Sequence, residues 1–321
     1  MILITGGLGF IGAHTARALL DLGEPCVLTT RSHVRKDPDF IASEIGERVY
    51  IEELDITDRA ALLQVGKRRE ITGIVHLAVG AVGWKVDDFR ANTEVLLNVL
   101  QATQDWGVPR VSIASTVGVY GGAAADPATG LLREDTPLPM TAAHPIPDFK
   151  KITELIAGGV ARQAGFEVVN LRLAAWGPLF HHPPSPINIP TQLVHAAVRG
   201  EAPDFSPPLS VPYAEDGFDT CYVKDCGRTI ALLQTAAKLN HATYNVGTGR
   251  ALKNKDVAAA IKAVIPDARI DLREGYDPNG PGDVFTLDIT RLREDTGFAP
   301  AYDTERAVAD YIAWLRAGNE Y

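Results

Sequence analysis

The chain has few of the features that mark membrane-bound or metal-binding proteins. Its 321 residues contain three cysteines, and the spacing of the last two suits neither a zinc knuckle nor a redox pair: Cys26, Cys221 and Cys226. We therefore expect small core side chains and no metal site. No apolar run approaches the roughly 20 residues of a membrane span, so a membrane partner is not expected.

The sequence also lacks a leader segment and a basic cluster. Met1 leads directly into an apolar segment, which leaves no room for a signal peptide, and a cytoplasmic location is expected. The formal net charge is −9, and no grouping of basic and aromatic residues offsets it. Nucleic acid is therefore not expected as a partner.

The first twelve residues carry the strongest signal. An apolar strand ends at Thr5 and runs into three glycines that recur at every third position, Gly6, Gly9 and Gly12. In such a turn one glycine permits the tight bend, one lets backbone approach a pyrophosphate, and one lets the helix pack on the strand. The helix expected over Phe10 to Leu22 begins with Phe10 and Ile11 and presents its positive end to the phosphates. The segment predicts a dinucleotide site.

Short apolar runs alternate with helical patterns through the first half of the chain. The runs are Ile2 to Thr5, Cys26 to Thr30, Val49 to Glu52, Ile74 to Leu77, Val111 to Ala114 and Val168 to Leu171. This alternation predicts an α/β fold with a Rossmann-type doubly wound parallel sheet. A ligand of such a sheet lies at the carboxyl ends of its strands.

The amino-acid composition changes near Pro178, and prolines are frequent from there to Pro212. We expect a dinucleotide-binding domain over 1–177, with returning segments from about 213–250, and a smaller C-terminal, mainly substrate-binding lobe over 178–321. The irregular stretch is typical of a binding surface or lid. The lobe is expected to use helices Ile187 to Arg199, Lys255 to Val264 and Asp303 to Ala317, and strands Thr220 to Val223 and Thr243 to Val246.

Further motifs follow the glycine string in order along nearly the whole chain. They are Asp55-Ile56-Thr57-Asp58, His76-Leu77-Ala78, Asn92, Ser115 to Gly121, Trp176-Gly177-Pro178, Tyr222 to Asp225, Tyr244 to Gly249 and Gly282-Asp283-Val284. Together with the string Thr5 to Gly12 they resemble the extended short-chain dehydrogenase/reductase family. Its members include sugar-nucleotide epimerases, dehydratases and dihydroflavonol-type reductases.

The resemblance implies a set of cofactor-binding residues beyond the glycine loop. It implies that Asp55 and Ile56 lie beside the adenine, and that Leu77 and Ala78 contact the cofactor from a strand end. It also implies that Asn92 opens a helix running to Trp106. In the same way it gives Thr116 the catalytic hydroxyl position and makes Lys150 the lysine that holds the nicotinamide ribose.

The end of the second expected strand bears on the choice of cofactor. NAD-preferring members carry a carboxylate there, whereas this chain has Thr30 followed by Arg31. The hydroxyls and cations between Thr29 and Lys36 suit a 2′-phosphate. Arg31 either donates two N–H groups to that phosphate or stacks on the adenine. A solvated basic loop is the alternative. We predict a preference for NADP(H), with NAD(H) as the second cofactor.

The resemblance also implies a tyrosine four residues before the lysine, which acts as acid or base on the substrate hydroxyl. Lys150 and Glu154 keep the family spacing, but Ile146 occupies the tyrosine position, and a register that uses Lys151 gives Pro147. Isoleucine cannot move a proton. Either another group does so, or the reaction differs.

The expected catalytic residues are therefore Thr116, Lys150 and His144. His144 lies two residues before Ile146, and a histidine side chain suits acid–base work near neutral pH. Other titratable candidates are Asp148, Tyr120, His181 and His182. The stretch Arg172 to Pro178 lacks the asparagine that touches substrate phosphates in many sugar-nucleotide members, and its Trp176 suits either a sugar-stacking position or the core. The candidate partners for an anionic group of the substrate are Arg172, Arg199 and Lys224.

We expect an NAD(P)-dependent epimerase, dehydratase or reductase that acts on a hydroxyl- or carbonyl-bearing small molecule, a sugar or sugar nucleotide first. The alternatives are a redox-neutral lyase or isomerase that uses a bound cofactor, and a non-catalytic dinucleotide sensor. A homodimer is expected through the helices Asn92 to Trp106 and Lys150 to Ala164. Apolar residues there equally suit packing on the sheet: Val95, Val99, Ile152 and Ile156.

Overall fold

A seven-stranded parallel sheet forms the centre of the molecule. The computed structural model describes residues 1–32, 37–80, 82–142, 144–179, 189–206, 210–280 and 285–319. The strand order is β11-β7-β5-β4-β1-β2-β3, and each neighbouring pair is parallel. The strands are β1 (Ile2–Thr5), β2 (Cys26–Thr30), β3 (Val49–Glu53), β4 (Gly73–His76), β5 (Arg110–Ala114), β7 (Glu167–Leu173) and β11 (Thr243–Val246).

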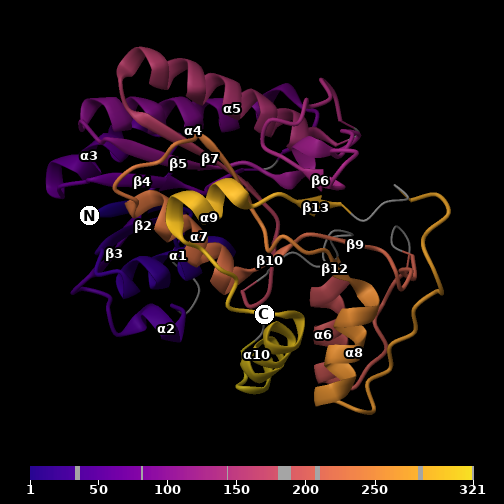
Figure 1. Ribbon diagram of the computed structural model, residues 1–321. Coiled ribbons are helices and arrows are strands. Elements are labelled where there is room, and N and C mark those ends of the chain that lie inside the picture. The colour runs from indigo at the N-terminus through magenta and orange to yellow at the C-terminus, as the bar shows by residue number, and fades with distance from the viewer. Residues whose placement is uncertain are drawn as a thin grey trace.

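Helices cover both faces of this sheet, and Figure 1 shows α4 and α5 together on one side and α1 and α7 on the other. Each face has its own buried cluster, because the strands alternate their apolar side chains between the two sides. The helices are α1 (Phe10–Asp21), α2 (Asp39–Ala42), α3 (Arg59–Arg68), α4 (Val86–Asp105), α5 (Pro145–Ala164), α7 (Val223–Thr235) and α9 (Thr290–Thr296). A 3-10 turn, η1 (Val117–Tyr120), follows β5.

A third buried cluster lies in a smaller group of helices at the lower right of Figure 1. These helices are α6 (Ile189–Arg199), α8 (Asn254–Val264) and α10 (Thr304–Arg316). Three small sheets accompany them and the loops: β8 (Ala175–Trp176) with β10 (Cys221–Tyr222), β9 (Gly217–Phe218) with β12 (Leu252–Lys253), and β6 (Leu131–Leu132) with β13 (Thr286–Leu287).

The predicted Rossmann-type sheet is confirmed, and all six apolar runs of the first half form its strands. Two element assignments were wrong. Asn92 does not open a helix: it lies in the second turn of α4, which begins at Val86 because the polar segment ahead of Asn92 is helical too. Val223 does not end a strand but begins α7, directly after the two-residue strand β10.

The strand Thr243 to Val246 was predicted for the smaller lobe, but it is β11 at the edge of the main sheet, paired with β7. The predicted helix from Lys150 is α5 and begins earlier, at Pro145, where a proline fits the first helical turn. Residues 187 and 188 of the predicted helix Ile187 to Arg199 lie outside the described residues, as do His181, His182 and the motif at 282–284.

The three cysteines are buried, as predicted. Trp176 is also a core residue: it packs edge-on against Tyr222 and Tyr311 and is 3% exposed. In the described ranges no group of three or more His, Cys, Asp or Glu residues is arranged to hold a metal ion. No helix of those ranges has the length and apolar character needed to cross a membrane.

Candidate active site

The glycine loop between β1 and α1 is built so tightly that side chains cannot enter it. Gly6 has a φ of +68°, a left-handed conformation that favours glycine. A Cβ on Gly12 would lie 2.3 Å from the carbonyl oxygen of Gly6, and one on Gly7 would lie 2.6 Å from the Leu28 side chain. The loop therefore brings bare backbone to the N-terminus of α1, which is the cradle that a pyrophosphate requires.

The hydroxyl of Thr5 joins the carboxyl ends of β1 and β4 beside this loop. It accepts hydrogen bonds from the backbone N–H groups of Leu77 and Ala78, each over 3.2 Å. These two bonds occupy both lone pairs of the hydroxyl oxygen. The hydroxyl therefore acts as the donor to Nδ1 of His76, over 2.7 Å. Burial lowers the pKa of His76 to about 3, and the charge of Lys150 acts in the same direction, so the imidazole is neutral.

A cavity of about 1110 Å³ opens beside the glycine loop. Its walls come from the ends of β1, β2, β3 and β4, from α4, and from the C-terminal turn of α10. Eight of the residues predicted to bind the cofactor line it: Gly6, Gly9, Thr30, Arg31, Asp55, Ile56, Ala78 and Asn92. The other predicted cofactor residues are not among its lining residues: Phe10, Ile11, Gly12, Leu77 and Lys150.

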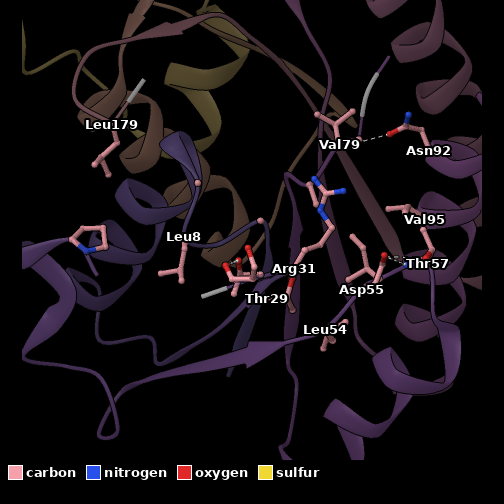
Figure 2. A pocket seen from close by; sticks show the side chains of 18 of the residues that line it. Leu8, Thr29, Arg31, Leu54, Asp55, Thr57, Val79, Asn92, Val95 and Leu179 are labelled. Carbon is pink, nitrogen blue, oxygen red and sulfur yellow. Dashed lines mark hydrogen bonds between the residues drawn. The ribbon is translucent and has the colours of Figure 1, made fainter. Parts of the chain in front are cut away.

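Arg31 and Asp55 face the same cavity, and Figure 2 shows the Arg31 side chain extending across it toward Val79. The carboxylate of Asp55 accepts hydrogen bonds from the backbone N–H and the hydroxyl of Thr57, each over 2.9 Å. These bonds lower the pKa of Asp55, and the Arg31 charge lowers it further. This end of the cavity therefore offers one fixed carboxylate and one guanidinium.

Asn92 supports the loop that follows β4. Its side-chain oxygen accepts the backbone N–H of Gly80 over 2.8 Å, and its amide nitrogen donates to the carbonyl oxygen of Asp88 over 2.8 Å. Figure 2 shows Asn92 and Val95 on the same wall of the cavity. Val95 is 8% exposed, so it belongs to this wall and to the core rather than to an outer helix face.

Lys150 reaches the carboxyl edge of the sheet from the second turn of α5. Its Nζ donates to the carbonyl oxygen of Ala114, the last residue of β5, over 2.6 Å. Burial lowers the pKa of Lys150 to about 8, and the Glu154 carboxylate one turn further along α5 opposes that shift. The lysine is thus a partly buried amine placed beside the Ser115-Thr116 motif.

The other two predicted catalytic residues cap short elements nearby. Thr116 caps η1, and its hydroxyl accepts the backbone N–H of Gly118 over 3.1 Å. His144 is exposed and caps α5, where its Nδ1 accepts the backbone N–H of Ile146 over 3.3 Å. Pro147 packs against Gly118, so the first turn of α5 lies directly beside the 3-10 turn. Ile146, in the tyrosine position, is 38% exposed.

A buried network ties this region together. The guanidinium of Arg172 donates twice to the Glu154 carboxylate, over 3.1 and 2.8 Å, and once to the hydroxyl of Tyr120 over 2.9 Å. Ser115 donates its hydroxyl proton to the same carboxylate. Arg172 is therefore an internal partner of Glu154 and not an anion site. The two other candidate anion partners are also paired: Arg199 with Glu201 and Lys224 with Asp310.

Several lining residues were not predicted. Some lie next to predicted ones in the sequence, and their neighbours were the available signal: Leu8, Thr57, Val79 and Gly80. Others come from distant parts of the chain, and no sequence signal pointed to them: Leu179, Trp314, Ala317, Gly318 and Asn319. Trp314 contacts Phe40, whose ring stacks on His14 of α1 at 4.8 Å.

The fold and this site define a dinucleotide-binding α/β protein, and comparison with known proteins narrows the class. The NAD dependent epimerase/dehydratase family matches residues 2–247. UDP-glucose 4-epimerase of Mus musculus is 27% identical over 98% of this chain and 96% of its own length. The chain therefore belongs to the NAD dependent epimerase/dehydratase family, and the resemblance to extended short-chain dehydrogenases/reductases is confirmed.

Solved structures show the same fold. A dTDP-glucose 4,6-dehydratase of Bacillus anthracis, in complex with NAD, superposes with a TM-score of 0.80 at 19% identity and covers 99% of this chain and 97% of its own. A UDP-glucose 4-epimerase of Thermotoga maritima, with UDP-glucose, gives a TM-score of 0.78 at 21% identity, with 99% of both chains covered. Nearly the whole chain thus shares the fold of these two solved proteins.

Proposed function

We propose that the protein is an NAD(P)-dependent enzyme of the epimerase/dehydratase type that acts on a sugar nucleotide and moves a proton without the usual tyrosine. The observation that carries this proposal is the meeting of three parts at one sheet edge. The glycine cradle lies at the end of β1, the Thr5–His76 pair at the end of β4, and Lys150 with Thr116 at the end of β5.

The residues present fit a nicotinamide dinucleotide. The glycine loop would hold the pyrophosphate at the N-terminus of α1, and the cavity at Asp55 and Ile56 would take the adenine. Lys150, with one N–H committed to Ala114, has two N–H groups left for the nicotinamide ribose. When bound, the nicotinamide supplies a hydride acceptor and donor.

The sugar-nucleotide substrate is proposed from the relatives. The mouse relative is a UDP-glucose 4-epimerase, and the Thermotoga maritima relative was solved with UDP-glucose. Both match nearly the full length of this chain, including the smaller group of helices α6, α8 and α10. We assign the sugar nucleotide to that group of helices, as the sequence predicted for a substrate lobe.

A preference for NADP(H) is proposed from the end of β2. Thr30 stands where a carboxylate would bind the ribose hydroxyls, and Arg31 lines the same cavity. A guanidinium is suited to a phosphate because it donates two parallel N–H groups to the phosphate oxygens. Arg31 also lies near the Asp55 carboxylate, which lowers the net positive charge available to a 2′-phosphate. NAD(H) is therefore the second cofactor to test.

A homodimer is proposed through α4 and α5, with a different apolar set from the one predicted. Val99 is fully buried against the sheet and Val95 nearly so, and Ile156 is partly buried in the same cluster. Ile152 is 39% exposed, and two further apolar side chains on these helices are exposed as well: Leu97 at 47% and Leu155 at 76%. Exposed apolar side chains on two adjoining helices suit a two-fold contact.

The test is a titration of the purified protein with NADPH and NADH, followed by nicotinamide fluorescence, and then a screen of sugar nucleotides. Binding with turnover of a sugar nucleotide supports the proposal. Binding with product formation but no lasting change in nicotinamide absorbance indicates a redox-neutral isomerase or lyase. Binding with no product across the panel favours a dinucleotide sensor.

A further inference from the structure

The tyrosine position is filled by Ile146, yet the rest of the proton-handling region is in place. Lys150 lies one turn along α5 from Ile146, its Nζ is held at the end of β5, and Ser115 and Thr116 follow directly. His144 points its Nδ1 lone pair at its own helix and is exposed. Of the described titratable groups named for this role, Lys150 lies directly at the end of β5. The hydroxyl of the buried Tyr120 is already engaged by Arg172 and Asn245.

We propose that Lys150 Nζ itself takes and returns the proton of the substrate hydroxyl, in place of the absent tyrosine. This inference rests on the proposed function. In the oxidising direction the neutral amine would accept the proton of the substrate hydroxyl, and a bound nicotinamide would supply the acceptor for the hydride of the same carbinol, which becomes a carbonyl. In the reverse direction the ammonium would return the proton to the carbonyl oxygen, and the reduced cofactor would supply the hydride.

The surroundings of Lys150 supply both forms of the amine near neutral pH. Burial lowers the pKa of Lys150 to about 8, close to working pH, as general acid–base catalysis requires. His76 at the end of β4 is neutral and adds no charge. Glu154 is the one carboxylate that favours the ammonium, and the two hydrogen bonds from Arg172 engage its charge. Because Glu154 is paired with Arg172, its charge raises the pKa of Lys150 by less than burial lowers it.

Glu154 and Arg172 are therefore positioning residues for the lysine, and they act with opposite sign. Arg172→Gln leaves the Glu154 carboxylate without its cationic partner, so that more of its charge acts on the lysine and the pKa of Lys150 should rise. Glu154→Gln removes the carboxylate and should lower it. A pair that served only to hold the fold would destabilise the protein in both variants without moving the lysine in opposite directions.

The experiment measures the rate at which a small acylating reagent labels Lys150 in the protein without cofactor, as a function of pH and by mass spectrometry. The exposed Lys238 is the reference for reagent access. Only the neutral amine reacts, so the labelling profile reports protonation without any turnover. We expect a midpoint near 8 in the wild type, a higher one in Arg172→Gln and a lower one in Glu154→Gln.

A second readout is the pH profile of kcat for turnover of UDP-glucose by the protein loaded with NADP⁺ or NAD⁺. We expect kcat to rise with pH along a limb whose midpoint follows the labelling midpoint in each variant. We also expect a loss of at least about 10²-fold in Lys150→Met, and partial activity in Lys150→Arg with that limb absent. If either network variant fails to fold by circular dichroism, the wild-type labelling midpoint and the two Lys150 variants still decide the question.

A wild-type midpoint in the ordinary lysine range, or a limb that persists in Lys150→Arg, would overturn the assignment of Lys150. Failure of the proposed function looks different. In that case neither NADPH nor NADH slows the labelling of Lys150, and no sugar nucleotide is turned over, whatever the labelling midpoint.

Discussion

The ammonium of Lys150 donates to the carbonyl oxygen of Ala114 over 2.6 Å, one helical turn beyond the position where Ile146 replaces tyrosine. This bond holds a partly buried amine at the end of β5, directly before the Ser115-Thr116 motif. Lys150 thus keeps the spacing that the family resemblance implies for its lysine, while the tyrosine position holds Ile146.

Restoring the tyrosine should therefore raise activity. Ile146 is 38% exposed at the start of α5, so a larger ring can be accommodated there. We expect Ile146→Tyr to raise kcat on the order of 10²-fold, since a positioned phenol is a stronger acid–base group than any present at that position. Ile146→Phe is the matched control for ring size. Equal rates in the two variants would show that this position does not face the reacting hydroxyl.

Removing the buried charge of Lys150 should stabilise the fold while abolishing turnover. The shift of the pKa from 10.5 to about 8 corresponds to roughly 3 kcal/mol, less the lost bond to Ala114. The wild type gains this stability as pH rises from about 8 to 10.5, because the folded lysine has lost its proton and the unfolded one has not. Urea unfolding should find Lys150→Met more stable than the wild type at pH 7, with the gap closing toward pH 10.5. A less stable variant at pH 7 would contradict the buried charge.

Arg31 should decide which nicotinamide cofactor binds. If it contacts a 2′-phosphate, Arg31→Ala should weaken NADPH about 10- to 100-fold and leave NADH nearly unchanged, because one charge-assisted contact is lost. If it lies on the adenine, both cofactors should weaken equally. Titration calorimetry with each cofactor distinguishes the two, and the exposed Arg269→Ala serves as control. No effect on either cofactor would place Arg31 outside the site.

His14 should make the fold sensitive to acid. It is buried in α1 beneath Phe40, and its Nε2 lies 3.3 Å from the carbonyl oxygen of Pro178. Burial lowers its pKa to about 4 from 6.5. Between these pH values His14 is protonated in the unfolded chain and neutral in the folded chain. The free energy of unfolding therefore falls as pH falls from 6.5 toward 4. Chemical unfolding across this range should show a shallower loss in His14→Leu than in the wild type. The exposed His241→Gln should follow the wild type, and identical slopes for all three proteins would refute the prediction.

The exposed apolar side chains of α4 and α5 should hold two copies together. Leu155 is 76% exposed, and a glutamate there would place a charge in the proposed contact. We expect light scattering to give a dimer mass for the wild type and a monomer mass for Leu155→Glu. Leu22→Glu is the matched control, because Leu22 is also exposed, at 48%, but lies at the end of α1. A monomeric wild type would remove this proposal.

The sequence was sufficient for the first-half strands of the main sheet and for the glycine loop because those features are local. An apolar run flanked by helical patterns predicts a buried parallel strand, and the glycine loop needs a fixed spacing, so β1 to β5, β7 and Gly6 to Gly12 could be predicted directly. The start of α4 was missed because Val86 to Ala91 is largely polar and carries no apolar period. The partners of Arg172 and Lys224 could not be known either, since Glu154 and Asp310 reach them only through the packed fold.

The wall that α10 adds to the cavity is the clearest case of information absent from the sequence. Trp314 and Leu8 line one cavity although they lie at opposite ends of the chain. Their approach follows from the packing of α10 on α6 and α8 and from the contact of Trp314 with Phe40. Neither residue lies in a sequence pattern that predicts a shared cavity with the other.

We propose above all that this chain catalyses nicotinamide-dependent chemistry on a sugar nucleotide without the family tyrosine. The most direct measurement incubates the wild type and Ile146→Tyr with UDP-glucose and NADP⁺ or NAD⁺, following nicotinamide reduction by absorbance and the sugar by nuclear magnetic resonance. We predict a product from both proteins, formed faster by Ile146→Tyr. Cofactor binding without any product from either protein would contradict the claim.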